Sequence, residues 1–226
     1  MALLEVRNVT KVYCAGGAPV VALQDISLNL DPGDFVALVG KSGCGKSTLL
    51  NLCGAMDFPS SGEVILDGQV TARLNDAGLT RLRREKVGFV FQSFQLIHTL
   101  TAAENVELPL LLAHKKDARE TAAERLRWVE MQEYAARFPH QLSGGQQQRV
   151  AIARALAANP RVLLADEPTG NLDTATGEAV LNQLARTARE FGMAVLMATH
   201  SSESAAVFDR VLRMRDGRIA EAAVLL

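Results

Sequence analysis

The stretch FVALVGKSGCGKS, residues 35–47, decides the fold of this chain. Residues 35–39 are all apolar, as expected of a strand that is buried on both faces. The remainder matches the pattern G-x-x-x-x-G-K-[ST] in full. Apolar residues then recur at helical spacing, so we expect a helix to start near Lys46. A strand, a glycine-rich loop and a helix in this order form the context in which such a loop binds phosphate.

The glycines of this loop let the backbone curl so that successive N–H groups point at phosphate oxygens. The helix N-terminus adds about half a positive charge in the same direction. We expect Lys46 to bridge the β- and γ-phosphates of a nucleotide and the Ser47 hydroxyl to ligate Mg²⁺. Cys44 is either a redox-sensitive thiol or a tolerated small side chain that contributes only its backbone N–H. The residues predicted to bind the nucleotide here are Gly40, Lys41, Ser42, Gly43, Cys44, Gly45, Lys46, Ser47 and Thr48.

Two carboxylates follow a second apolar run, Val162–Ala165. If this strand ends beside the phosphate loop, Asp166 lies in the Mg²⁺ shell and Glu167 is positioned to polarise the attacking water. A general base of this kind contributes roughly 10²–10⁴ in rate. The alternative is a solvated acidic turn, because Asp-Glu-Pro is ordinary turn chemistry.

A histidine, His200, follows a third apolar run, residues 194–199. Its functional interpretation is that it holds the γ-phosphate and the water in line, and the alternative is a capping or surface histidine. The order of strand and histidine, together with the elements above, favours the functional interpretation. The other histidines, His98, His114 and His140, are interpreted as surface residues.

A second glycine-rich cluster lies at residues 142–146. Ser143 and Gln146 have the spacing of a capping box, which predicts a helix start. A helix N-terminus is also an anion site, so the two interpretations are compatible. The cluster consists of Leu142, Ser143, Gly144, Gly145 and Gln146.

Composition limits the class of protein. The 226 residues suit one large domain or one domain with an inserted lobe, and the 24 basic and 25 acidic residues nearly cancel, which argues against a nucleic-acid partner. Three cysteines are no disulfide framework and indicate a reducing cytosol. Residues 1–8 do not read as a signal peptide. The densest apolar run, residues 108–113, is far shorter than the roughly 18 residues that span a bilayer, so other subunits must do any crossing.

The pattern of elements predicts an α/β core with parallel strands, because apolar strands alternate with helical segments. In residues 1–39 apolar and polar residues alternate, which is typical of strands. Residues 93–141 are predicted to be helical and to form a separate lobe. Gly192 is expected to cap a helix, and Asp216-Gly217 is expected to close a hairpin.

The full set of motifs, in this order, resembles the ATP-binding cassette (ABC) ATPases over essentially the whole chain. It comprises Tyr13, the phosphate loop, Gln92, Leu142–Gln146, Asp166-Glu167, Asn171-Leu172-Asp173 and His200. The resemblance implies one nucleotide-binding domain, residues 1–226. It has a P-loop NTPase (RecA-like) core with a mainly parallel sheet and an N-terminal antiparallel β-subdomain (1–92 and 142–226), and an inserted α-helical subdomain (about 93–141).

The resemblance also implies a role for each motif. Tyr13 would stack on adenine, while Ser47, Gln92 and Asp166 would hold Mg²⁺. The catalytic residues would be Glu167, His200 and Gln92. Residues Leu142–Gln146 would close over the γ-phosphate of ATP held by a second copy of the chain, and Asp173 would link the two sites. Two ATP molecules would thus lie between two chains packed head to tail.

Within this family the chain is similar to the lipoprotein-releasing and macrolide-exporter type (LolD/MacB-like). The segments that carry this similarity are Gly88–Gln92, Glu104–Leu110 and Asp166–Asp173. It implies membrane permease subunits docked near Gln92–Ile97, where Phe91, Phe94, Leu96 and Ile97 form an apolar groove or else pack in the lobe core. The chain would then be a peripheral protein on the cytoplasmic face of the inner membrane.

Two alternatives stay open on the sequence. One is an FtsE-like cell-division ATPase that signals to wall hydrolases through a membrane partner. The other is a soluble ABC ATPase that acts on nucleic acid or ribosomes. The near-zero net charge and the presence of a single cassette argue against the second.

Overall fold

A six-stranded sheet built around β3 (Phe35–Val39) forms the centre of the molecule. The structure is a computed structural model, and it describes residues 2–14, 16–199 and 207–224. The strand order is β10–β9–β3–β8–β7–β6, with every pair parallel except β9 and β10. The remaining strands of this sheet are β6 (Val87–Val90), β7 (Val162–Asp166), β8 (Ala194–Thr199), β9 (Arg210–Arg215) and β10 (Arg218–Val224). The prediction of an α/β fold with a mainly parallel sheet is confirmed.

Strand β3 is apolar throughout because both of its faces are covered. Phe35 and Ala37 belong to one hydrophobic core, and Val36 and Leu38 belong to a second core on the opposite face. Side chains alternate between the two faces of a strand, so each core receives every second residue.

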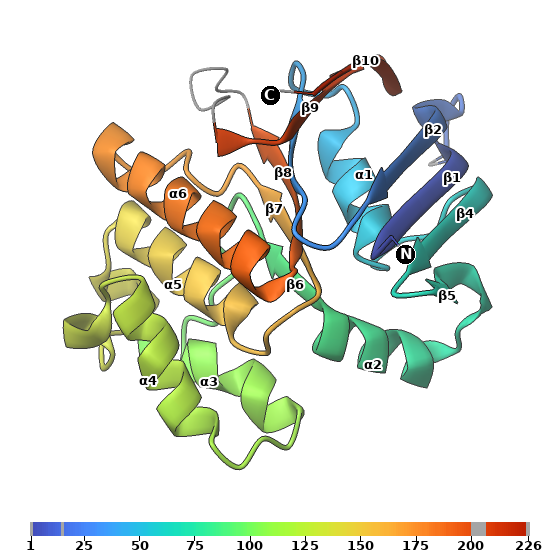
Figure 1. Cartoon of the computed structure of the whole chain (residues 1–226). Helices are drawn as coiled ribbons and strands as arrows, with labels where there is room; N and C mark the ends of the chain where they lie inside the picture. The colour runs from blue at the N-terminus through green and yellow to red at the C-terminus, as the bar shows by residue number, and fades with distance from the viewer. Residues whose placement is uncertain (1, 15, 200–206, 225–226) are drawn as a thin grey trace.

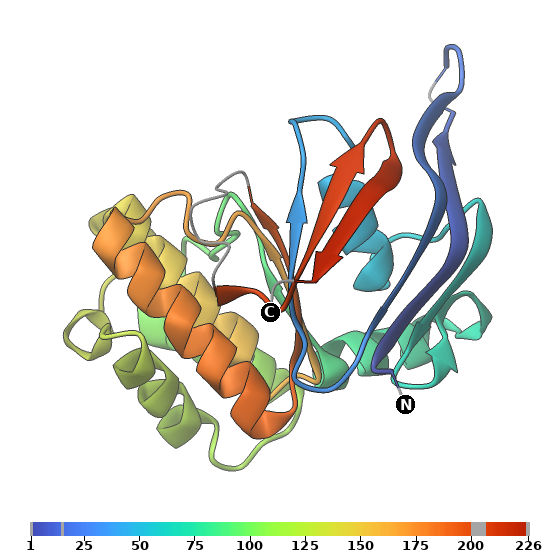
Figure 2. The same ribbon diagram turned by 45° about the horizontal axis from the view of Figure 1, so that its top comes forward.

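The second core lies between the central sheet and an antiparallel sheet of order β2–β1–β4–β5. Helix α1 (Lys46–Cys53) fills this space, as Figure 2 shows. The strands of the antiparallel sheet are β1 (Leu4–Tyr13), β2 (Val20–Leu30), β4 (Ser61–Leu66) and β5 (Gln69–Val70).

Helices α5 (Gly144–Leu156) and α6 (Thr174–Phe191) cover the other face of the central sheet (Figure 1). Helices α3 (Ala102–Leu112) and α4 (Ala118–Trp128) pack outside α5. Helix α2 (Asp76–Lys86) leads from the antiparallel sheet to β6. Short 3-10 turns occupy Thr71–Arg73, Gln132–Tyr134 and Pro139–Gln141.

Local signals in the sequence set the helix ends. Capping boxes at Thr101 and Ser143 start α3 and α5, and Gly192 ends α6 in the left-handed conformation with φ of 63°. Residues 93–141 are less helical than expected, since a loop precedes α3 and turns follow α4. Among the described residues, no helix combines the length and the apolar composition that crossing a membrane requires.

Candidate functional site

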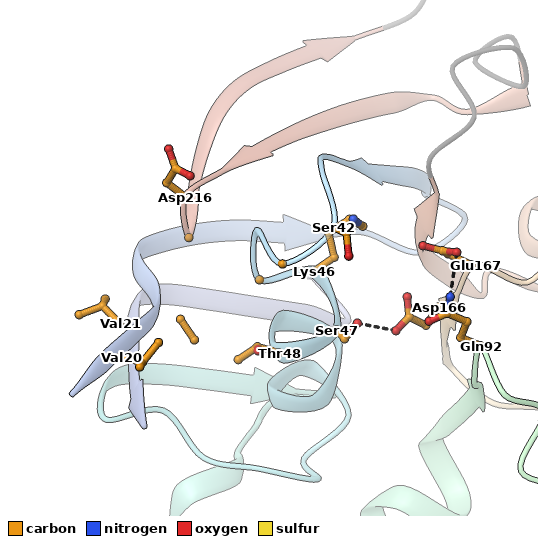
Figure 3. Close-up of a pocket in the computed structure, with 14 residues that line it drawn as sticks. Val20, Val21, Ser42, Lys46, Ser47, Thr48, Gln92, Asp166, Glu167 and Asp216 are labelled. Carbon is orange, nitrogen blue, oxygen red and sulfur yellow. Dashed lines mark hydrogen bonds between the residues drawn. The ribbon is translucent and has the colours of Figure 1, made fainter. Parts of the chain in front are cut away.

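A cavity of about 510 Å³ lies at the ends of the parallel strands, where the chain leaves β3, β6 and β7 (Figure 3). The parallel topology gathers these strand ends at one edge of the sheet. The predicted site residues that line the cavity are Ser42, Gly43, Gly45, Lys46, Ser47, Thr48, Gln92, Asp166 and Glu167. The phosphate loop and the acidic strand tip therefore face the same space.

Lys46 begins α1 and is 6% exposed. Its Nζ atom donates hydrogen bonds to the carbonyl oxygens of Gly40 at 2.7 Å and Lys41 at 3.2 Å. The loop thus holds its own cation in place, which offsets the cost of burying the charge.

Ser47 and Asp166 are in direct contact. The Ser47 hydroxyl donates a hydrogen bond of 2.6 Å to Oδ2 of Asp166, and Figure 3 shows both side chains at the wall of the cavity. A hydroxyl and a carboxylate oxygen are hard ligands of the kind that Mg²⁺ prefers, with phosphate oxygens and water completing its shell. Among the described residues no group of three His, Cys, Asp or Glu could hold a metal on its own. The pair fits Mg²⁺ that arrives with a nucleotide.

Glu167 is the first residue after β7, and Gln92 follows the neighbouring strand β6. Nε2 of Gln92 donates a hydrogen bond of 3.1 Å to Oε2 of Glu167. Glu167 has a φ of 51°, a left-handed conformation that costs about 1–3 kcal/mol in a non-glycine residue. Its backbone N–H donates to the carbonyl oxygen of Ala198 on β8 at 2.9 Å, which helps to hold this turn.

Tyr13 does not line the cavity, but two neighbours, Asp57 and Lys11, hold its side chain at the end of β1. Its hydroxyl donates a hydrogen bond of 2.9 Å to Oδ2 of Asp57, and Nζ of Lys11 lies 4.8 Å from the ring centroid. The same Nζ atom contacts Oδ1 of Asp57 at 2.7 Å. Partial burial, followed by the hydrogen bond to Asp57, raises the pKa of Tyr13. Partial burial acts to raise the pKa of Asp57. The hydrogen bonds that Asp57 accepts from Lys11, the Phe58 N–H and Tyr13 have a larger effect, and they hold its pKa below the usual value.

The cluster at residues 142–146 lies apart from the cavity and starts α5. Ser143 Oγ accepts a hydrogen bond from the Gln146 N–H at 3.3 Å, and Gln146 Oε1 accepts one from the Ser143 N–H at 2.9 Å. The predicted capping box is therefore present. Ser143 and Gly144 are exposed, while Leu142 packs into the core.

Asp173 starts α6. Its Oδ1 atom accepts a hydrogen bond of 3.0 Å from the Thr176 N–H, as an N-cap does. Its hydrogen bonds with Thr176 lower the pKa of Asp173, and the charge of Arg149 contributes least. His200 lies outside the described residues.

Several residues that line the cavity were not predicted to belong to the site. Val20, Val21 and Ala22 come from β2, while Asp216 and Gly217 form the β9–β10 turn. The sequence indicated a hairpin at this turn, but only the fold brings it to the phosphate loop. Val20 and Val21 are 63% and 53% exposed, and this exposure of two apolar side chains indicates a ligand-contacting surface once the structure is known.

The segment Gln92–Ile97 forms no apolar groove by itself. Leu96 is 6% exposed and Phe94 packs against the core, whereas Ile97 is 41% exposed. Arg154 donates to the carbonyl oxygens of Phe94 at 2.8 Å and Gln95 at 2.5 Å, which fixes this loop. A second cavity, of about 260 Å³, lies next to it between α2, β6, α3 and α5. Its lining includes Arg84, Phe89, Leu108, Pro109, Leu112 and Arg154.

Comparison with known proteins identifies close relatives. Residues 23–170 match the family described as ABC transporter. The chain is 47% identical over 223 residues to an uncharacterised ABC transporter ATP-binding protein, MJ0796, of Methanocaldococcus jannaschii, covering 96% of this chain and 95% of the relative. It is 44% identical over 219 residues to the lipoprotein-releasing system ATP-binding protein LolD of Hyphomonas neptunium, covering 96% of each.

Two further comparisons extend this result. The chain is 46% identical to the macrolide export ATP-binding/permease protein MacB of Syntrophobacter fumaroxidans over 97% of this chain but 31% of that protein. The solved dimeric post-hydrolysis structure of the cassette MJ0796 bound to ADP and Pi superposes with a TM-score of 0.94 at 44% identity, over 99% of each chain.

Proposed function

The chain belongs to the ABC transporter family of ATP-binding proteins, and from this membership we propose that two copies of it hydrolyse ATP at shared sites and drive a membrane permease. Each chain is an ATPase, and it supplies one phosphate loop and one acidic strand tip to a site. The 142–146 cluster of the other chain completes that site. The proposed arrangement is a head-to-tail pair that encloses two ATP molecules.

One observation carries the proposal that each site is shared. The cavity is lined by the phosphate loop and by the acidic tip of β7, but by none of residues 142–146, all of which the structure describes. Ser143 and Gly144 instead lie exposed at the N-terminus of α5. An exposed helix N-terminus is an anion site. A nucleotide bound to a second copy is the ligand that it fits.

Electrostatics supplies the reason that ATP would favour the closed pair. ATP brings about four negative charges, and one lysine with one loop leaves part of that charge uncompensated. A second helix N-terminus adds hydrogen-bond donors at the γ-phosphate. Hydrolysis releases this phosphate and so removes the interaction that holds the two chains together. We propose that Ser47, Asp166 and Gln92 hold Mg²⁺ in this state, which neutralises phosphate charge.

We also propose roles for the remaining site residues. Glu167 activates the attacking water, oriented by Gln92, and Tyr13 provides a face for adenine. Val20 and Val21 extend that apolar surface along β2. His200 remains a proposed contributor, and Asp173 a proposed link between the two sites.

The permease would contact the chain beside Gln92–Ile97, through exposed Ile97 and the neighbouring cavity. Apolar side chains of β6 and α3 line that cavity together with arginines, which suits a mainly apolar helix from the partner. Such a permease, of the MacB or lipoprotein-releasing type, would hold the chain at the cytoplasmic face of the inner membrane. The similarity to LolD and to part of MacB supports this partner class over a soluble role.

Two measurements test the proposal. The ATPase rate per chain should rise with protein concentration, because each site needs two chains, and a rate independent of concentration would contradict sharing. The chain should also co-purify with a four-helix permease that bears a large external domain. A domain that activates wall hydrolases would instead support the cell-division alternative.

A further inference from the structure

The carbonyl oxygen of Ala22 on β2 is enclosed by two glycines from distant parts of the chain. A Cβ atom built on Gly45, in the phosphate loop, would lie 2.7 Å from this oxygen, and one built on Gly217, in the β9–β10 turn, would lie 2.8 Å from it. Both distances are well inside van der Waals contact, which begins near 3.5 Å. The loop, β2 and the turn are therefore stacked backbone against backbone.

Hydrogen bonds tie the same three segments together. The Gly217 N–H donates to the carbonyl oxygen of Cys44 at 3.1 Å, and the Gln24 N–H donates to the carbonyl oxygen of Gly217 at 2.8 Å. Met214, at the end of β9, adds a further contact, because a Cβ atom on Gly40 would lie 2.5 Å from its carbonyl oxygen. The β9–β10 hairpin thus touches both ends of the phosphate loop, through Met214 of β9 and Gly217 of the turn.

We propose that Gly217 is a positioning residue for ATP binding, which fixes the phosphate loop through the carbonyl groups of Ala22 and Cys44. This inference rests on the proposed binding of ATP phosphates by that loop. When the N–H groups of the loop are already aligned, the loop does not need to reorganise as the phosphate charge binds. A displacement of the loop by even 1 Å would misalign several N–H groups at once, and such misplacement can cost as much as about 100-fold.

The chain contains its own control. Asp67-Gly68, the turn between β4 and β5, has φ angles of 47° and 76°, and Asp216-Gly217 has 48° and 74°. A Cβ atom on Gly68 would meet nothing within 4 Å. Alanine therefore adds the same backbone strain at both turns, but only at Gly217 does it also push on β2 and the phosphate loop.

The experiment compares Gly217→Ala with Gly68→Ala in the full chain. A fluorescent ATP analogue measures Kd, and thermal unfolding checks that both variants are equally folded at the temperature of the binding measurement. We expect Gly217→Ala to weaken binding by about tenfold or more, and Gly68→Ala to change Kd by less than about twofold. Equal Kd values in the two variants would overturn the inference.

Three further variants keep the test decisive. If Gly217→Ala does not fold, Gly217→Asn and Gly68→Asn repeat the comparison, because asparagine tolerates positive φ and still carries a Cβ atom. Lys46→Ala tests the proposed phosphate site itself. Unchanged binding in Lys46→Ala would contradict the proposed site. Lost binding in Lys46→Ala with normal binding in both Gly217 variants would contradict only the positioning role.

Discussion

Nε2 of Gln92 donates a hydrogen bond of 3.1 Å to Oε2 of Glu167, across the ends of the neighbouring parallel strands β6 and β7. The residue proposed to activate water is therefore oriented by the loop that we propose lies beside the permease. A movement of that loop would change the direction of the carboxylate. The contact offers a direct physical route by which docking could control hydrolysis.

Glu167→Gln should preserve ATP binding and lower the hydrolysis rate by about 10²–10⁴-fold, because the amide keeps the shape but cannot accept a proton. The pair of chains should then persist with ATP, measured by light scattering after gel filtration. Glu120→Gln, the same change at an exposed position on α4, serves as the control. A normal rate in Glu167→Gln would show that another group is the base.

Ser143→Arg should abolish turnover that depends on two chains while each phosphate loop still binds nucleotide. The bulky cation would block the exposed helix end that we propose contacts the partner's ATP. Loss of the N-cap also costs about 1 kcal/mol of stability. Thr101→Ala removes the equivalent cap of α3 and separates this cost from the effect on turnover. Loss of nucleotide binding by single Ser143→Arg chains would contradict action in trans.

Asp57→Asn should weaken ATP binding severalfold without changing the affinity for inorganic tripolyphosphate. The variant loses the carboxylate that holds the Tyr13 hydroxyl, and tripolyphosphate has no base for Tyr13 to stack on. Asp67→Asn is the matched control, because the Asp67–Lys86 ion pair, at 2.8 Å, resembles the Asp57–Lys11 pair at 2.7 Å. Equal weakening for both ligands would mean that Asp57 acts on the phosphate loop instead.

The lowered pKa of Asp57 also predicts a pH dependence. The folded state binds this proton more weakly than the unfolded state, so Asp57 stabilises the fold above pH about 4 and loses that contribution as the pH falls through its folded pKa. Urea unfolding at several pH values below about 5 should show a shallower loss of stability in Asp57→Asn than in the wild type. An identical slope in both proteins would contradict the assignment.

Asn105→Leu should destabilise the chain by about 1–3 kcal/mol or more, measured by urea unfolding. Asn105 is fully buried, and its side chain bonds the backbone of Ile97, Leu100 and Thr101. Leucine has a similar size but leaves these buried groups without partners. Hydrogen exchange should report faster opening of residues 97–101, and unchanged exchange would contradict this role.

The sequence was most informative where one strong local signal acts alone. Strands β3 and β8 begin and end at the predicted residues, and β7 extends the apolar run Val162–Ala165 by one residue, because each strand is mainly apolar and has two covered faces. The phosphate loop was recognisable because its glycines are needed for the backbone path. Helix α2 carried no such signal, since only Leu79 and Leu82 on it are buried and its surface is strongly charged.

Long-range contacts could not be predicted from the sequence. The hydrogen bond between Tyr13 and Asp57 joins β1 to the loop before β4, and the contact of Gly217 with Cys44 joins the β9–β10 hairpin to the phosphate loop. Helix α3 contains Pro109 in its interior, within the segment that was predicted to be helical. Leu96 was one of four apolar residues suggested for the docking groove, and its place in the core became evident only from packing.

The pairing of β3 has a consequence for how the protein is made. Its neighbours in the sheet are β8 and β9, which both follow β3 in the sequence and leave the ribosome after it. The strand that carries the phosphate loop therefore has no partner in this sheet until β8 and β9 emerge, and its backbone groups stay unpaired until then. A chain that stops before β8 and β9 leaves β3 unpaired and cannot hold the phosphate loop in this shape, so ATP can be captured only after these two strands have been made.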